Sequence, residues 1–394
     1  MRGSKVLWFL GLNLMVAAGP GPGVPVASAA EDAPPASPIY GKPFLQRGTA
    51  AVGGYMDIEF LAGEDGSTFD QHRFVPFLYA EVSDRVHVAS EIEFEHGGLV
   101  SGGGGTDGEI KVEFATIDIA VGEPLNVRGG VLLSPLGRTN IYHDAPMLDL
   151  TERPLVDRSI IPTTLSESGL GVYGTVYPSD LVVVQYEAYL VNGFDDGTVN
   201  GDGVLSIRSG RGSQRNDNNN SRAFTGRVNV SPRLGTDIGV SVHTGDYDSE
   251  GRRNLTIAAL DFMFARGPVE VLGTGATARA DLSAGDVQAV AGAAPEDPAK
   301  AAGFFLEGRV HFLAGAVAGL PQGVFTGTVR ADYVDRDTNV DGHDQERLTL
   351  GVNLRITEET VVKNDVLFDR ERASGSTSWG DTGTAYRFSL ATYF

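Results

Sequence analysis

The sequence predicts an all-β protein, a transmembrane antiparallel β-barrel of about 16 strands with short periplasmic turns and long outer loops. Apolar and polar residues alternate along segments of about ten residues or more, the length that a tilted membrane strand needs. The connections between these segments are by turns short and long. After the first thirty residues, no apolar run is long enough for a transmembrane helix.

The first thirty residues have the pattern of a secretory signal peptide. Arg2 and Lys5 give a positively charged start, residues 6–18 are almost all apolar, and small residues at 27–30 offer a cleavage site. We therefore expect a signal peptide at 1–30, a Pro-, Ala- and Ser-rich periplasmic lead-in at 31–47, and the barrel at 48–394.

Composition narrows the function classes. The chain of 394 residues has no Cys and a formal charge of -20. An exported protein without disulfides depends on burial and hydrogen bonding, which a closed barrel supplies. The acidic balance argues against a nucleic-acid partner, because such a partner needs a basic surface.

The alternating segments give the expected strands. They are 48–60, 68–82, 85–96, 109–121, 124–134, 169–177, 180–192, 221–231, 236–246, 253–265, 268–281, 302–314, 323–335, 345–356, 360–370 and 385–394. Tight connections are expected at 83–84, 122–123, 178–179, 232–235, 267 and 357–359, with a longer one on the same rim at 315–322. Longer connections, rich in Gly, Asp, Asn and Ser, are expected at 61–67, 97–108, 135–168, 193–220, 247–252, 282–301, 336–344 and 371–384. Short turns on one rim and long loops on the other are typical of outer-membrane barrels.

The period of two is clearest in segment 85–96. Val86, Val88, Ile92 and Phe94 alternate there with charged residues, which a helix would not separate onto two faces. Segments 302–314, 345–356 and 385–394 repeat the pattern. A soluble β-sandwich also alternates, but its strands average about five or six residues, so the membrane barrel is favoured.

The sequence ends in AYRFSLATYF, an aromatic strand. We expect Tyr386, Phe388, Leu390 and Phe394 to face lipid, because the last residues of a soluble chain are usually frayed and polar. This ending is similar to that of outer-membrane proteins in general, and the resemblance implies recognition by the barrel assembly machinery.

A barrel of about sixteen strands is too wide for side chains to fill, so we expect a water-filled lumen. The pore-lining candidates are Glu91, Glu93, Glu95, Lys111, Glu113, Arg128, Arg309, Arg330, Arg347, Arg355 and Arg387. The four Glu residues could form an acidic wall, and Arg347, Arg355 and Arg387 a basic one. Either the two walls produce a field that filters ions, or the charges only solvate the lumen.

The connection at 135–168 is the longest and carries several apolar residues, among them Ile141, Leu150 and Ile160. An apolar loop is not expected to stay in water, so it folds inward and narrows the pore, or it packs on a neighbouring subunit. The constriction candidates are Arg138, His143, Asp144, Asp149, Glu152, Arg153, Asp157 and Arg158.

Four runs carry a resemblance to a known family: SEIEFEHGG (90–98), VRGGVLLSPLGRTNIYH (127–143), RPLVDRSIIP (153–162) and GLGVYG (169–174). They resemble the porin superfamily that includes the phosphate-selective porins O and P. The resemblance implies a sixteen-stranded channel that forms a homotrimer. Phosphate selectivity in that family depends on lumenal arginines and lysines. Of the lysines here only Lys111 and Lys363 are expected in the lumen, so no phosphate-binding residue is carried over.

A weak calcium motif lies at 335–346. Asp335, Asp337, Asn339, Asp341 and Glu346 occupy the first, third, fifth, seventh and twelfth positions of a calcium-loop spacing. Val340 replaces the glycine that the sixth position needs, and strands flank the segment. A hydrated hairpin loop is the favoured interpretation, and no metal site is predicted.

No enzyme signature is present. The chain has no HExxH, residues 166–169 do not form a nucleophile elbow, and the seven His residues lack metal-ligand spacing. We expect no catalytic residue and no cofactor. The sequence instead predicts a porin of the bacterial outer membrane, in contact with its lipid, that lets small hydrophilic solutes or ions diffuse passively. The alternatives are a substrate-specific anion channel of the phosphate type and, more distantly, a structural or adhesive barrel.

Overall fold

The computed structural model describes residues 50–64, 66–97, 108–201, 203–283, 298–339, 341–373 and 375–394. These residues form sixteen strands, as the sequence predicts. The strands are β1 (Ala50–Gly63), β2 (Gly66–Ser83), β3 (Val86–Glu95), β4 (Glu109–Gly122), β5 (Leu125–Leu133), β6 (Ser166–Val176), β7 (Val183–Val191), β8 (Ala223–Arg233), β9 (Thr236–Asp246), β10 (Asn254–Arg266), β11 (Val269–Ala280), β12 (Ala299–Phe312), β13 (Val324–Asp335), β14 (Asp344–Arg355), β15 (Thr360–Glu371) and β16 (Gly383–Tyr393). The helices are short: η2 (Ala145–Met147), α1 (Leu155–Ser159) and η3 (Asp196–Thr198).

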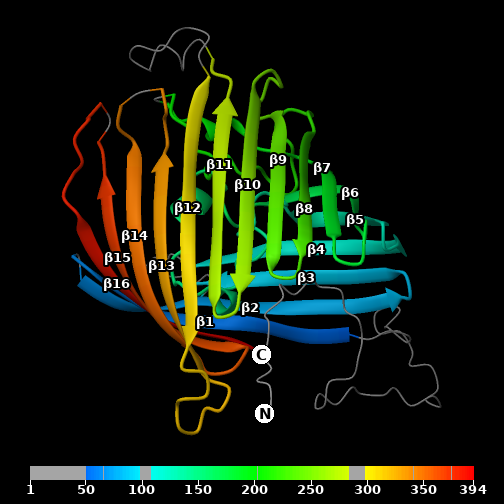
Figure 1. Ribbon diagram of the computed structural model, residues 1–394. Helices are drawn as coiled ribbons and strands as arrows, with labels where there is room; N and C mark the ends of the chain where they lie inside the picture. The colour runs from blue at the N-terminus through cyan, green and yellow to red at the C-terminus, as the bar shows by residue number, and fades with distance from the viewer. Residues whose placement is uncertain are drawn as a thin grey trace.

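The strands close into one antiparallel barrel. Each strand pairs with its sequence neighbours, and β1 pairs with β16 from Tyr55↔Tyr393 to Ala62↔Tyr386. Figure 1 shows β1 to β4 running across the lower part of the view and β8 to β13 running steeply across the front, with β16 next to β1. A closed barrel leaves no unpaired strand edge in the bilayer.

The seam between β1 and β16 depends on close backbone contact. The amide of Phe394 donates to the Gly54 carbonyl at 2.9 Å, and the Gly54 amide donates to the Phe394 carbonyl at 3.1 Å. A Cβ at Gly54 would lie 2.3 Å from the Val75 carbonyl oxygen, so only glycine fits there. The Phe394 ring stacks on Phe74 with 5.7 Å between centroids. The barrel therefore closes through the aromatic C-terminal strand, β16.

Every strand bound lies within three residues of the sequence expectation, and the largest differences occur in β1, β6, β7, which begins at Val183 rather than 180, and β12, which begins at Ala299 rather than 302. The connection expected at 61–67 is wrong, because β1 and β2 continue to pair as far as Gly63↔Gly66. The long connection after β5 ends at 165 rather than 168, because Ser166 pairs with Leu133 in the ladder between β5 and β6. The expected long connection on the short-turn rim, between β12 and β13, is confirmed.

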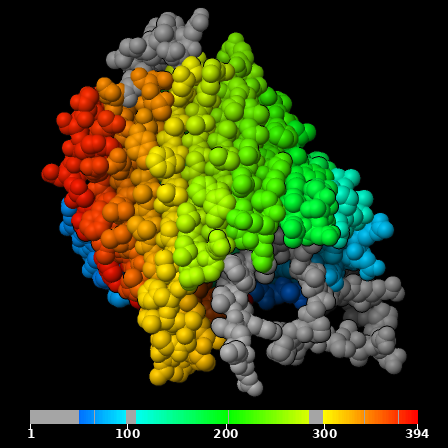
Figure 2. Space-filling view, viewed as in Figure 1, coloured from blue at the N-terminus to red at the C-terminus, as the bar shows by residue number. Residues whose placement is uncertain are grey.

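The outer surface of the barrel is apolar. On β12, Phe304, Leu306 and Val310 are each about half exposed, whereas the alternate residues Phe305 and Glu307 are buried inside. Tyr386, Leu390 and Phe394 also face outward, as expected. Figure 2 shows this wall as a continuous packed surface over β9 to β13. Among the described residues, no helix has the length and apolar character needed to cross a membrane.

The two sides of the barrel interior differ in chemistry. The inner faces of β10 and β11 and of the first half of β12 are largely apolar and belong to a buried cluster that includes Leu255, Ile257, Leu272 and Phe305. The inner faces of β1 to β4 carry buried charged groups instead, among them Asp57, Glu91 and Glu113. The interior therefore offers one apolar surface and one charged surface to whatever occupies it.

Candidate functional site in the barrel lumen

The connection between β5 and β6, residues 134–165, lies inside the barrel, where Figure 1 shows its helix behind the wall strands. We call it the inward loop. Its two ends are tied together by buried Asn140, whose Nδ2 donates to the carbonyls of Ser134 at 2.7 Å and Leu165 at 3.0 Å. The Leu165 amide donates to Asn140 Oδ1 at 2.8 Å. A single side chain thus closes the base of the loop.

Residues 154–161 of the inward loop, which we call the apolar arm, pack against the apolar side of the interior. Helix α1 contacts β11, β12 and β13. Val156, Ile160 and Ile161 are fully buried in the same cluster as Ile257 of β10. This packing explains why β10 is apolar on both faces, unlike a strand that lines open water.

Residues 143–153, the charged arm, are held mainly by ion pairs and hydrogen bonds. Asp149 Oδ2 lies 2.9 Å from Arg309 Nη1, and its Oδ1 lies 3.1 Å from Arg355 Nη2. Glu152 Oε1 lies 3.0 Å from Arg387 Nε, and the Glu152 carbonyl accepts from Arg330 at 3.0 Å. The arginines of β12, β13, β14 and β16 thus bind the loop instead of lining an open lumen.

Further contacts fix the start of the charged arm to β4, β15 and β16. Tyr393 donates to Asp144 Oδ2 at 2.8 Å, and Lys363 Nζ donates to the Ala145 carbonyl at 2.7 Å. His143 Nε2 lies 3.0 Å from Glu113 Oε2 on β4. The charged arm therefore crosses the interior from β4 to the wall of β14 to β16.

The carboxylates of the two arms have opposite electrostatic environments. Burial alone would raise the pKa of Asp149, but Arg309 and Arg355 outweigh it and lower the pKa to about 2. Arginines similarly outweigh burial at Glu152 and lower its pKa to about 2. In the apolar arm, burial raises the pKa of Asp157 to about 7.

The expected acidic wall on β3 and β4 is present but largely compensated. Arg73 Nε lies 2.6 Å from Glu93 Oε1 and 3.1 Å from Glu95 Oε1. Lys111 Nζ donates to the Thr164 hydroxyl and carbonyl, each at 2.9 Å. The expected basic wall is compensated too, since Arg347 pairs with Asp369 at 2.7 Å. The strong transverse field that isolated walls would give is therefore reduced.

The remaining candidates fall into two groups. Arg138, Arg153 and Arg128 lie in the interior, where Arg128 Nε pairs with Asp118 at 2.6 Å. Arg153 is half-buried, and its buried Nε and Nη2 have no hydrogen-bond partner among the described residues. Arg158, at the end of α1, is 50% exposed. Every pore-lining candidate lies on an inward-facing position of its strand.

A basic cluster formed by two loops was missed by the sequence analysis. Arg208 and Arg211, between β7 and β8, donate to the carbonyls of Thr163 at 2.8 Å and Thr164 at 3.2 Å. Arg208 is exposed overall, but partial desolvation of its guanidinium group, together with the nearby guanidinium groups of Arg211 and Arg158, lowers its pKa. The segment 193–220 gave no signal beyond its loop composition, because this contact depends on how the inward loop folds.

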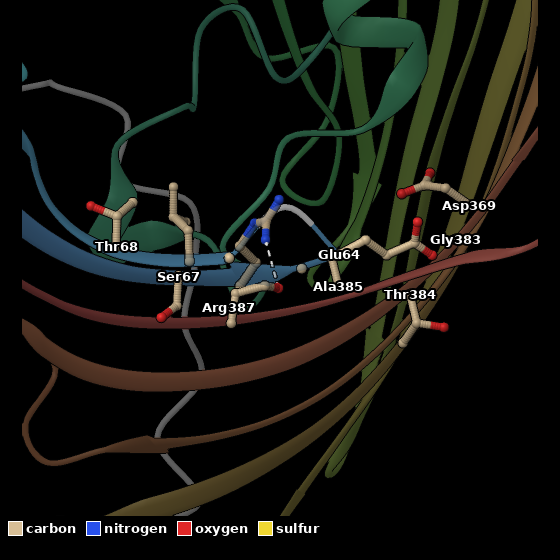
Figure 3. A pocket seen from close by; sticks show the side chains of 12 residues that line it. Glu64, Ser67, Thr68, Asp369, Gly383, Thr384, Ala385 and Arg387 are labelled. Atoms are coloured by element: carbon tan, nitrogen blue, oxygen red, sulfur yellow. Dashed lines mark hydrogen bonds between the residues drawn. The ribbon is translucent and has the colours of Figure 1, made fainter.

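A cavity of about 480 Å³ opens at the outer end of the seam. The hairpin of β1 and β2 and the strands β15 and β16 line it, with Glu64, Thr68, Asp369 and Arg387 among the residues drawn in Figure 3. The dashed line there is the hydrogen bond from Arg387 Nη1 to the Ala62 carbonyl, 3.5 Å long. Since Arg387 also binds Glu152, the cavity borders the charged arm.

Two groups of side chains in the described part of the chain could each hold a metal ion. Asp57, Glu59 and His72 form the first, and Glu91, Glu113 and His143 the second; the ligand atoms of each group lie within 4.8 Å of one another. Asp57 and Glu59 alternate with Ile58 and Phe60, so the period of two along β1 could have marked them as lumenal.

The weak calcium motif lies at the β13–β14 hairpin. Oδ1 of Asp335 accepts from the Asp337 amide at 3.0 Å, and Oδ1 of Asp337 accepts from the Asn339 amide at 3.1 Å. Glu346 lies in β14 and pairs with Arg370. These carboxylates have protein partners, and calcium binding at this hairpin stays untested. The segments expected to be the signal peptide, 1–30, and the lead-in, 31–47, lie outside the described residues.

Comparisons with known proteins support the fold. No family model matches the chain. An uncharacterised protein of Aquifex aeolicus (strain VF5) is 32% identical over 224 residues, which cover 55% of this chain and 49% of that protein, so the chain spans about half the length of this relative.

Two solved structures share the barrel. An anion-selective porin from Comamonas acidovorans matches with a TM-score of 0.58 and 12% identity, covering 88% of this chain and 100% of the porin. The trimer form of OmpT, an outer-membrane protein of Vibrio cholerae, matches with a TM-score of 0.55 and 12% identity, covering 88% and 99%. At this identity the matches show the porin fold alone. The fold and the apolar outer belt together place the chain in a bacterial outer membrane.

Proposed function

We propose that the chain is an outer-membrane porin through which small hydrophilic solutes and ions diffuse passively, with the inward loop setting the size limit. The observation that carries the proposal is the attachment of this loop to the inside of a sixteen-stranded barrel by both ion pairs and apolar packing. A barrel of this width is too wide for wall side chains alone to fill, so an inward loop narrows an aqueous path.

Single-channel recording on the purified protein in planar lipid bilayers tests the proposal. We expect stepwise conductance that scales with bulk salt, together with uptake of small sugars but not large ones by proteoliposomes. Absence of both would contradict the porin proposal and favour the structural or adhesive barrel.

An anion-specific channel is the second candidate. The observation that favours it is the basic cluster of Lys111, Arg158, Arg208 and Arg211 around Thr163 and Thr164. Clustered charge of one sign raises the local concentration of the opposite ion. The reversal potential in asymmetric KCl distinguishes the candidates: strong anion preference with block by phosphate supports the specific channel, and weak preference supports the general porin.

A homotrimer is the proposed assembly, in keeping with the trimer form in which the OmpT structure was solved. Migration on SDS gels before and after boiling tests it. We expect a slow band near three times the chain mass that disappears on heating, whereas a monomeric mass in mild detergent would contradict the trimer. Recognition by the barrel assembly machinery stays a prediction.

A further inference from the structure

A buried group of three side chains joins the inward loop to the wall. Glu91 on β3, Glu113 on β4 and His143 of the loop are 3%, 0% and 1% exposed. One ligand atom from each lies within 4.8 Å of the other two. Two carboxylates held this close and away from water need either a shared proton or a cation between them.

The hydrogen bonds of His143 hold its ring in the orientation that a metal ligand needs. Its Nδ1 lies 3.2 Å from the Asn140 carbonyl, which can only accept, so Nδ1 carries the proton and donates. In the neutral ring, Nε2 then presents its lone pair toward Glu113. Histidine ligands in metalloproteins are commonly fixed by such a bond from the second ring nitrogen to a backbone carbonyl.

The carboxylates leave one oxygen without a partner. Oε1 of Glu113 accepts from the Thr164 hydroxyl at 2.8 Å, while its Oε2 lies 3.0 Å from His143 Nε2. Oε1 of Glu91 is buried and has no hydrogen-bond partner in the described part of the chain. A protonated His143 would satisfy Glu113, and a proton shared with Glu113 would neutralise Glu91. A divalent cation bound by one ligand atom from each group would compensate both carboxylates at once.

The second group, Asp57, Glu59 and His72, can compensate its own charges without a metal ion. His72 Nδ1 lies 3.1 Å from Asp57 Oδ2 and 2.8 Å from Glu59 Oε1, so a single proton on the ring can bridge both carboxylates. His72 is also partly exposed, at 19%. This group therefore serves as a matched control, because it also has two carboxylates and one imidazole but in a different arrangement.

We infer that Glu91, Glu113 and His143 bind one divalent transition-metal ion, for which Zn²⁺ is the probe, and that the ion fastens the inward loop to β3 and β4. One imidazole and two carboxylates suit Zn²⁺, with water in the fourth position, whereas Ca²⁺ prefers six to eight oxygen ligands. Ligand atoms about 2.1 Å from a tetrahedral ion lie about 3.4 Å apart, close to the 3.0 Å between His143 Nε2 and Glu113 Oε2.

Charged neighbours moderate the affinity without filling the site. Lys111 is held by Thr164, and Arg73 pairs with Glu93 and Glu95. Asp144, which accepts from Tyr393, adds a negative charge next to His143. The inference does not depend on conduction, because a loop fastened by a metal ion would serve a closed barrel equally well.

Metal analysis of the untagged full chain in detergent tests the inference. A chelator first removes bound metal from the protein. The protein is then equilibrated with Zn²⁺ and desalted, and its zinc content is measured by elemental mass spectrometry. We expect about one ion per chain, and Glu91→Gln and His143→Asn should each weaken Zn²⁺ binding by at least about tenfold. His72→Asn should bind as the wild type does. Heat-modifiable migration shows that each variant is folded.

The inference is overturned if the folded wild type retains no Zn²⁺ above a mock-treated control, or if His72→Asn loses the ion as completely as His143→Asn. If His143→Asn does not fold, the Glu91→Gln variant tests the inference in its place, because this substitution keeps the shape of the side chain. Weak conduction in every sample would contradict the porin proposal alone and would leave the binding result valid.

Discussion

The charged arm and the apolar arm of the inward loop are neighbours in sequence but are held in the barrel by opposite kinds of contact. Asp149 and Glu152 in the charged arm meet arginines of β12 to β16. Val156 and Ile161 in the apolar arm meet the apolar inner wall. The pKa of Asp149 falls to about 2, whereas that of Asp157 rises to about 7.

This contrast teaches that loop position and loop stability depend on different residues. Buried ion pairs fix geometry but add little net stability over apolar packing, although breaking one by removing a partner is costly. Burial of apolar side chains supplies stability without directional preference. The two arms should therefore respond differently to truncation, to pH and to charge reversal.

Removal of the central carboxylate of the charged arm should have the largest effect. Asp149→Ala leaves Arg309 and Arg355 buried with one partner fewer, which should cost about 3–5 kcal/mol in the free energy that docks the loop. Hydrogen exchange of residues 143–153 by mass spectrometry measures the change. Glu346→Ala, which breaks a partly exposed pair with Arg370, is the control and should cost about 1 kcal/mol or less. Equal effects would contradict the account.

Truncation in the apolar arm should come next. Ile161 is fully buried, so Ile161→Ala should destabilise the docked loop by about 2–5 kcal/mol through lost burial and a cavity. Ile141→Ala, at a half-buried position of the same loop, should cost clearly less. Limited proteolysis of the loop, compared with urea unfolding of the barrel, separates local from global loss. A larger effect for Ile141→Ala would refute the assigned packing.

The pH dependence should distinguish the arms at intermediate pH. Asp157 has a pKa of about 7 in the folded protein against an ordinary 3.8, so the docked loop holds a proton that the released loop loses. The contribution of Asp157 to docking is therefore largest below about pH 4, weakens by up to about 1.4 kcal/mol per pH unit as the pH rises to about 7, and is constant above. Proteolysis rates across this range measure it, and Asp157→Asn should abolish the slope. A slope that survives the substitution must come from another group.

Charge reversal in the basic cluster should give the smallest effect. Arg208 is exposed, and an exposed charge at contact distance contributes about 1 kcal/mol or less in water. Arg208→Glu should lower the permeability ratio of anion to cation roughly two- to fivefold, measured from reversal potentials in asymmetric KCl. Arg233→Glu, in the β8–β9 turn region, is the control. No shift would remove the basic cluster from the ion path.

The barrel could be predicted from the sequence because its rule is local. Alternation of residues such as Val86 and His87 reports which face of a strand meets lipid, and the number and order of strands follow. The strand extension to Gly63 was missed because Gly and Ser near the hairpin imitate a loop. β1 and β2 nevertheless pair as far as this hairpin despite its loop-like composition.

The site was predicted as a set of residues but not as an arrangement. The inward-facing charges and the loop were identified, yet Glu113 and His143 are 30 residues apart, and their contact depends on the path of the whole loop. The contact between Arg208 and Thr163 is equally non-local. Alternation reveals the face of a strand but not the partner of a side chain inside the barrel.

Single-channel conductance of the double variant Asp149→Ala/Ile161→Ala, compared with the wild type, tests the central claim most directly. If the inward loop narrows the conducting path, releasing both arms should increase the conductance and admit larger sugars in proteoliposomes. An unchanged conductance in a folded, heat-modifiable variant whose loop has become accessible to protease would contradict the claim.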